Sequence, residues 1–178
     1  IESPFSKIFF RLAVPNLFST IIASATTIFD LWYVGQIGIP ELAGVAYIFP
    51  IYMLASMLSN GAFGGAVSGA TARAFGSKNI FKAECIFRSA ILIALFGALL
   101  MMTLFFCLAE TFFTYLSIDQ KITTSALTYG RILLGGISLI WLFNIVIAIT
   151  RGSGNTQIPA ISWLIVLIFH ILVASINF

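Results

Sequence analysis

The chain has 178 residues, of which 60% are hydrophobic and only 8% carry a charge. About a quarter of the residues in soluble domains are charged, so this composition excludes a water-soluble globule. The net charge of +3 could suggest nucleic-acid binding. However, the basic residues of the chain lie between apolar stretches and form no basic patch. We therefore predict an all-α polytopic membrane protein.

Five stretches are long and apolar enough to cross a bilayer, for which about 20 residues suffice. We predict transmembrane helices over residues 4–36, 42–72, 81–113, 124–151 and 157–178. Pro15 predicts a kink in the first helix. The run Gly76-Ser77-Lys78-Asn79 predicts a turn between the second and third helices. Asn155 or Thr156 is expected to cap the start of the fifth helix.

Basic residues are distributed unevenly between the two ends of these predicted helices. Lys121 and Arg131 fall on one side. The other side holds Lys7, Arg11, Arg73, Lys78, Lys82, Arg88 and Arg151. Because basic residues accumulate on the cytoplasmic side of membrane proteins, we predict a cytoplasmic N-terminus in a plasma (inner) membrane.

The first predicted helix contains an aspartate, Asp30, which is costly at membrane depth. Translocon-based scales put that cost at roughly 2.5 to 3.5 kcal/mol, so such a residue is a functional candidate by default. Ser19, Ala23 and Thr26 share its helical face. Hydroxyls leading to a carboxylate are what a proton site, a sodium site or a site for a cationic substrate would need. The alternative is a structural aspartate that neighbouring helices satisfy or that water reaches at the outer interface.

Four further polar residues lie within apolar stretches and are candidate substrate-binding residues. They are Asn60, Tyr129, Asn144 and His170. Each has a structural alternative: buried histidine and asparagine often serve helix packing, and tyrosine is common at membrane interfaces.

Glycines spaced four apart predict a helix face that another backbone can approach closely. Gly61, Gly65 and Gly69 form this face in the second helix. Plain helix packing is the simpler interpretation. The alternative is that the face lines a cavity or slides during transport.

Enzymatic function is not indicated, and we expect no cofactor. The chain has one histidine, no cysteine or histidine cluster with the spacing of a metal site, and no phosphate-binding glycine loop. Cys85 and Cys107 would lie about 33 Å apart on one helix, too far for a disulfide.

Several segments together resemble the multidrug and toxin extrusion (MATE) family. They are Ala13-Val-Pro15, Thr27-Ile-Phe-Asp30, Val34-Gly35-Gln-Ile-Gly38, Glu41-Leu-Ala43, the run from Gly61 to Gly76, Tyr129-Gly-Arg131-Ile and Thr150-Arg151-Gly-Ser-Gly154-Asn155. Each segment alone is a weak signal. Their order and spacing over essentially the whole chain are fairly specific.

The resemblance implies that the five helices form most of one six-helix lobe of a two-lobe secondary antiporter. Such a protein exports cationic or amphiphilic compounds in exchange for H⁺ or Na⁺. It further implies that Asp30 matches an N-lobe carboxylate linked to cation coupling, and that Tyr129 and Asn144 face the same cavity. A C-terminal lobe would then be a missing partner of this chain.

The chain departs from the family pattern in its fifth predicted helix. Many members carry an asparagine there, followed four residues later by an aspartate. The corresponding positions, counted from Pro159, hold His170 and Ala174. This departure leaves a two-aspartate site and the identity of the coupling ion open.

Two alternatives to a drug antiporter remain at this point. One is a lipid-linked saccharide flippase of a related superfamily, which would be expected to line its cavity with arginine or lysine. The other is a non-transporting membrane fragment. The single deep charge, which is acidic, argues against the flippase.

Overall fold

The computed structural model describes the backbone of residues 5–116 and 118–177, and the side chains of residues 13–14, 17–18, 20–116 and 118–173. The described elements are all helical. In chain order they are α1 (Phe5–Ile37), α2 (Ile39–Ser56), the π-helix η1 (Met57–Phe63), α3 (Gly64–Gly76), α4 (Ile80–Tyr115), α5 (Gln120–Gly135), α6 (Ile137–Gly152) and α7 (Gln157–Asn177).

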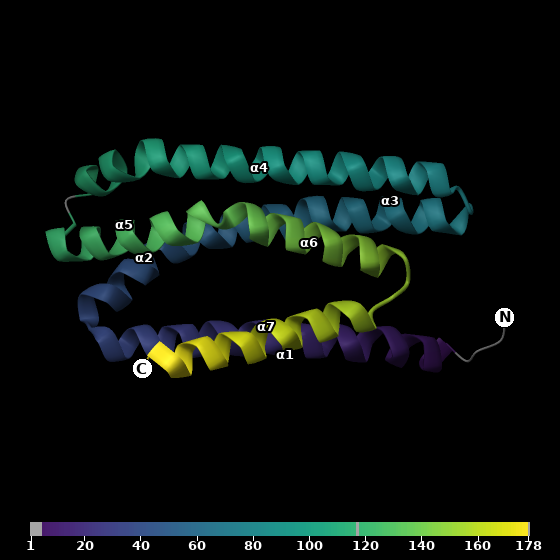
Figure 1. Ribbon diagram of the computed structural model, residues 1–178, viewed down its shortest axis with the longest axis horizontal. Helices are drawn as coiled ribbons and strands as arrows, with labels where there is room; N and C mark the ends of the chain where they lie inside the picture. The colour runs from purple at the N-terminus through teal and green to yellow at the C-terminus, as the bar shows by residue number, and fades with distance from the viewer. Residues whose placement is uncertain (1–4, 117, 178) are drawn as a thin grey trace.

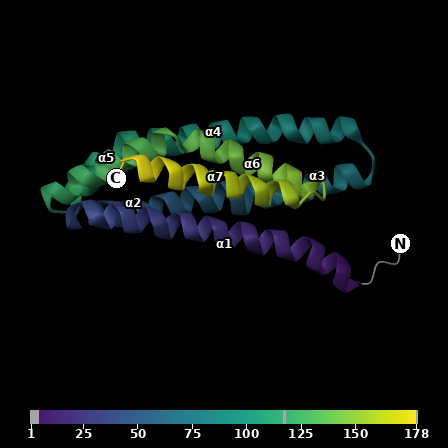
Figure 2. The ribbon, with the colours of Figure 1, turned by 60° about the horizontal axis from the view of Figure 1, so that its bottom comes forward.

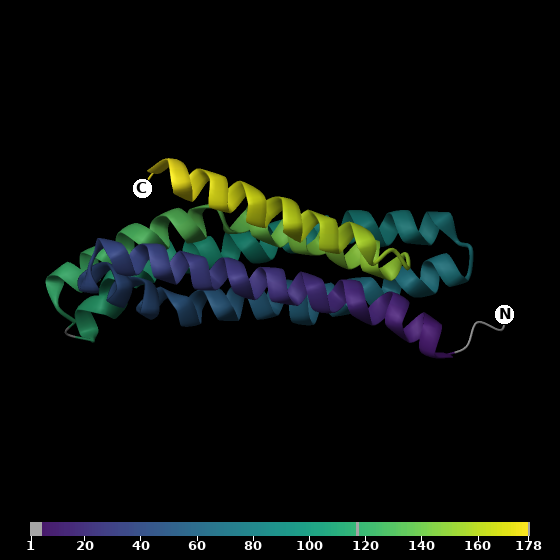
Figure 3. The same ribbon diagram turned by 90° about the horizontal axis from the view of Figure 1, so that it is seen from below.

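The helices run roughly along one long axis and form two groups. α1 and α7 pack against each other, while α5 packs against α2, and α6 packs against α3 and α4. Figure 1 shows the α1–α7 pair below the remaining helices, and Figure 3 shows the two groups of helices from below. The α3–α4 and α6–α7 turns lie at the same end as the start of α1, whereas the α1–α2 and α4–α5 turns lie at the other (Figures 1 and 2).

Local backbone geometry and hydrogen bonds mark two helix boundaries that the sequence predicts, the α3–α4 turn and the start of α7. Lys78 adopts a left-handed backbone with φ of 54° in the α3–α4 turn. The next residue, Asn79, caps α4 by accepting a hydrogen bond from the backbone N–H of Lys82 at 2.9 Å. Asn155 caps α7 in the same way by accepting from Gln157 and Ile158. The predicted turn and the Asn155 cap are confirmed.

The second predicted helix is interrupted by η1, which the sequence analysis does not predict. Ile39–Gly76 is one continuous helical stretch, but its middle winds as a π-helix. A π-helical turn holds an extra residue and so rotates the following side chains relative to an α-helix. Gly61 and Gly65 have open space around them among the described atoms. The close helix approach expected at this glycine face occurs elsewhere.

The fourth predicted helix, residues 124–151, is two helices and not one. α5 and α6 meet at Gly136 with a bend of 45°. Gly136 has φ of −90° and ψ of 3°, outside the α-helical region. Two consecutive glycines, Gly135 and Gly136, weaken the helix at this point, because glycine has a lower helix propensity than residues with a Cβ.

Two described helical stretches are long and apolar enough to cross a membrane, Ile39–Gly76 and Ile80–Tyr115. The bent α5–α6 pair is a third if it counts as one span, and Gln157–Val173 is a shorter apolar helix. The prediction of five spans remains a prediction, because α1 and α7 are described only in part.

The core lies where α2, α4, α5 and α6 meet. Its largest fully buried side chains include Trp141, Phe113 and Ile48. Two glycines, Gly44 and Gly97, allow this packing. A Cβ at Gly44 would lie 2.7 Å from the backbone nitrogen of Ala126 in α5. A Cβ at Gly97 would overlap the ring of Trp141. Glycine is therefore required where helices touch most closely.

Candidate functional site

A cavity of about 680 Å³ lies between the α1–α7 pair and the rest of the helices. This volume is within the usual range for small-molecule sites, roughly 300 to 1,000 Å³. Its lining comes from five helices and η1. The lining residues are Thr20, Ala23, Ser24, Thr26, Thr27, Asp30, Leu31, Val45, Phe49, Tyr52, Met53, Ser56, Asn60, Tyr129, Leu133, Leu139, Ile140, Phe143, Asn144, Trp163 and Val166.

Asp30 lies on the α1 wall and is the sole charged side chain among these lining residues. The face that leads to it also lines the cavity, as the sequence predicts. However, the hydroxyls of Thr26 and Thr27 donate to the backbone oxygens of Ile22 and Ala23. The hydroxyl protons of Thr26 and Thr27 are therefore used in hydrogen bonds within α1. Only the lone pairs of the two hydroxyl oxygens remain available for other partners. The side chain of Ser19, which the sequence analysis places on this face, lies outside the described ones.

His170 reaches Asp30 from the facing helix, α7. Its Nε2 lies 2.9 Å from Oδ1 of Asp30, a distance that makes an ion pair when the imidazole is protonated. The two side chains are 31% and 50% exposed. His170 is not among the residues that line the cavity, although it was predicted as a substrate-binding residue. It contacts the acid at the cavity wall.

Two tyrosines that line the cavity interact electrostatically with Asp30. Tyr129 in α5 and Tyr52 in α2 are both within electrostatic reach of its carboxylate and of each other. The hydroxyl of Tyr52 also forms a hydrogen bond with Ser56. Tyr129 was predicted and Tyr52 was missed. A usable signal existed, because Tyr52, Ser56 and Asn60 stand four residues apart and so share a helix face.

Asn144 and Asn60 both line the cavity and both bond to another helix. Nδ2 of Asn144 donates to Oγ of Ser59 at 2.8 Å, and these two residues are 4% and 0% exposed. Oδ1 of Asn60 accepts from Nη2 of Arg151 at 3.2 Å. Each asparagine therefore both joins two helices and lines the cavity, so the two interpretations are true at once.

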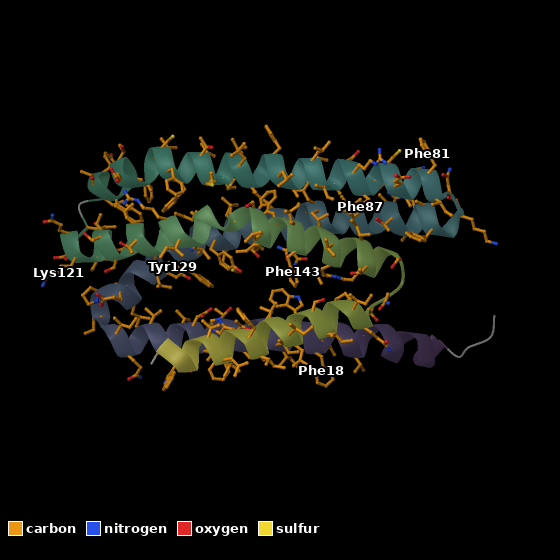
Figure 4. All side chains as sticks on the ribbon, viewed as in Figure 1. Phe18, Phe81, Phe87, Lys121, Tyr129 and Phe143 are labelled. Atoms are coloured by element: carbon orange, nitrogen blue, oxygen red, sulfur yellow. The ribbon has the colours of Figure 1, made fainter. Side chains whose placement is uncertain are left out.

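Two aromatic side chains from α6 and α7 line the cavity and contact each other. The rings of Phe143 in α6 and Trp163 in α7 meet edge to face at 5.4 Å. Figure 4 shows Phe143 between α6 and α7, whereas Phe18 points away from the molecule. Neither Phe143 nor Trp163 was predicted, because many aromatic residues are spread over the apolar stretches and none has a pattern that distinguishes it.

The site therefore combines one carboxylate, a facing imidazole, phenol and amide groups and an aromatic wall. Such a set can hold a cation by charge and by cation–π contact. It can also orient polar groups of a ligand by hydrogen bonds.

Comparison with known proteins places the chain among transporters. The family model MatE matches residues 15–176. An FAD transporter of Shewanella oneidensis is 22% identical over 160 residues, which are 90% of this chain and 35% of the relative. The chain thus spans about a third of the length of that relative.

Solved MATE structures share the fold. A crystal structure of a MATE protein in complex with MaD3S gives a TM-score of 0.83 at 23% identity, covering 89% of this chain and 35% of the other. An outward-facing multidrug resistance MATE family transporter of the MOP superfamily gives 0.81 at 22% identity, covering 88% and 35%. A MOP superfamily transporter from Pyrococcus furiosus gives 0.80 at 22% identity, covering 88% and 34%.

The family match over nearly all of the sequence and the shared fold support the same conclusion as the motifs around Asp30. The chain belongs to the MatE family of membrane transporters.

Proposed function

We propose that this chain is the cation-binding lobe of an antiporter that exports cationic or amphiphilic compounds in exchange for H⁺ or Na⁺. The observation that carries the proposal is the cavity of about 680 Å³, in which Asp30 is the sole charged lining residue. A carboxylate on the wall of a largely apolar cavity attracts an organic cation, and the aromatic rings that line the cavity add cation–π contacts. The membrane is proposed to be the plasma (inner) membrane.

The chain is proposed to work together with a second lobe. Its relatives are about three times as long, and transporters of this kind bind substrate at the interface of two repeats. Alternating access of the cavity would then come from movement of the two lobes around a fixed site.

A lipid-linked saccharide flippase is less well supported by the cavity. Phosphate recognition needs cationic side chains such as arginine. No lysine or arginine is among the described residues that line the cavity, and Arg151 is held beside it by Asn60.

A flavin dinucleotide is a second candidate substrate. The relative named as an FAD transporter and the aromatic pair Phe143–Trp163 favour it, because flat rings stack on such side chains. The phosphates of such a substrate would meet the Asp30 carboxylate unfavourably. FAD should therefore not compete with an organic cation for export if the first proposal is right.

The first proposal is tested with Asp30→Asn in the full-length protein. We expect loss of efflux of a cationic dye with unchanged abundance in the membrane, because the amide keeps the shape of the side chain and removes its charge. Asp119→Asn is the matched control, since Asp119 caps α5 at the end of the molecule and asparagine caps equally well. Efflux retained by Asp30→Asn would remove the assigned role.

A further inference from the structure

The contact between Asp30 and His170 joins the two helices of the α1–α7 pair. Nε2 of His170 lies 2.9 Å from Oδ1 of Asp30. That nitrogen is closed off from solvent and makes no hydrogen bond of ordinary geometry with the described residues. The carboxylate is therefore its nearest charged partner.

A nitrogen lone pair and a carboxylate oxygen repel each other at this distance, so the contact favours a proton on Nε2. When both ring nitrogens carry a proton, the imidazole is a cation placed directly on the Asp30 carboxylate. This is the contact that a cationic substrate would make from the cavity side. Two cations on one carboxylate repel each other, so the imidazolium and the substrate compete.

Few other described groups can alter the charge of His170. α7 packs against α1 and α6. The titratable side chains described in α1 are those of Asp30 and Tyr33, and the one described in α6 is that of Arg151, in its last turn. Arg151 adjoins the start of α7, about 20 Å along the helix from His170 at 1.5 Å per residue. Tyr52 and Tyr129, which line the cavity, interact electrostatically with Asp30.

We propose that His170 is the proton-binding residue of this site, and that its imidazolium displaces a bound organic cation from Asp30, which makes H⁺ the coupling ion. The inference rests on the proposed export of cations. Protonation changes the charge of the pair from −1 to zero, and the attraction for a cation is lost. Histidine suits this role because it is the side chain that ordinarily changes charge between pH 5 and pH 8.

The test measures binding of tetraphenylphosphonium to the purified full-length protein between pH 5 and pH 8. This probe keeps its charge throughout, so only the protein titrates. If protonated His170 blocks the site, the apparent Kd of the wild type should rise by about tenfold or more from pH 8 to pH 5, the range in which histidine side chains ordinarily change charge.

The decisive variant is His170→Gln, whose side-chain amide nitrogen can occupy the place of Nε2 and donate to Asp30 without titrating. We expect this variant to lose most of the pH dependence of Kd over the same range, because the amide cannot take up a proton. His170→Lys supplies a fixed cation, so its Kd should be at least tenfold above that of the wild type at pH 8 and should vary little with pH. Should either variant fold poorly, the other still tests the proposal.

The control is Phe169→Leu, a change at a neighbouring position that is 68% exposed and does not line the cavity. Its pH profile should match that of the wild type. A pH dependence as large as that of the wild type in His170→Gln would overturn the assignment to His170 and leave the proposed cation export standing. A wild type that binds no probe at any pH would overturn both.

Discussion

Polar side chains in these apolar helices do two things at once. Asn144 is buried and bonds to Ser59 across the interface of α6 and η1, yet it also lines the cavity. A buried amide without a partner would lose hydrogen bonds that water gives it in the unfolded chain. Ser59 is therefore needed to keep Asn144 in position, and the pair fixes the rotation of η1 relative to α6.

The Asn144–Ser59 bond should have a measurable but modest coupling energy. We expect a double-mutant cycle of Asn144→Val and Ser59→Ala to give about 0.6 kcal/mol, and no more than about 1.7, as for other hydrogen bonds between membrane helices. The measurement is SDS-induced unfolding of the purified protein. A coupling energy near zero would mean that the two side chains do not interact.

The sequence was sufficient to select four of the residues that line the cavity, but not their partners. Asp30, Asn60, Tyr129 and Asn144 stood out because polar residues are rare in such apolar stretches, and all four line the cavity. The contact of His170 with Asp30 could not be foreseen. It depends on how α7 is rotated against α1, which residue spacing within one helix does not determine.

At the scale of elements, the predicted helix positions agree with the structure while two internal breaks do not. The π-helix η1 and the bend at Gly136 both lie inside stretches whose hydropathy is continuous. Hydropathy reports only whether residues prefer lipid, so it is blind to the winding of the backbone. The Gly135-Gly136 pair was a visible signal for the bend, whereas η1 had none that we can identify in composition.

Glycine positions at helix contacts should be intolerant of even one added methyl group. In Gly44→Ala the new Cβ would meet the backbone of α5, which cannot move aside as a flexible side chain could. We expect a loss of about 1 to 3 kcal/mol, the usual cost of overpacking. The measurement is again SDS-induced unfolding.

Gly35→Ala is the matched control, because its Cβ would meet no described atom within 4 Å. Alanine has the higher helix propensity, so this variant should be neutral or more stable by up to about 1 kcal/mol. Equal destabilisation of both variants would show that helix contact is not the cause.

For the whole molecule, the positions of the turns agree with a chain that crosses a membrane back and forth. The N-terminal end of the molecule carries the α3–α4 turn with its basic residues, and the opposite end carries the α4–α5 turn (Figure 1). The charge bias between the two ends predicts a cytoplasmic location for the end that holds Ser77.

This orientation predicts opposite labelling of two single-cysteine variants in a background with Cys85 and Cys107 replaced by serine. Ser77→Cys lies in the α3–α4 turn, and Lys121→Cys lies at the opposite end of the molecule (Figure 4). A membrane-impermeant maleimide should label Lys121→Cys in intact cells and Ser77→Cys only after permeabilisation. Both positions are exposed, so the two variants should label equally once the membrane is open. Labelling of Ser77→Cys in intact cells would reverse the orientation, and the proton that we assign to His170 would then reach the site from the other side of the membrane.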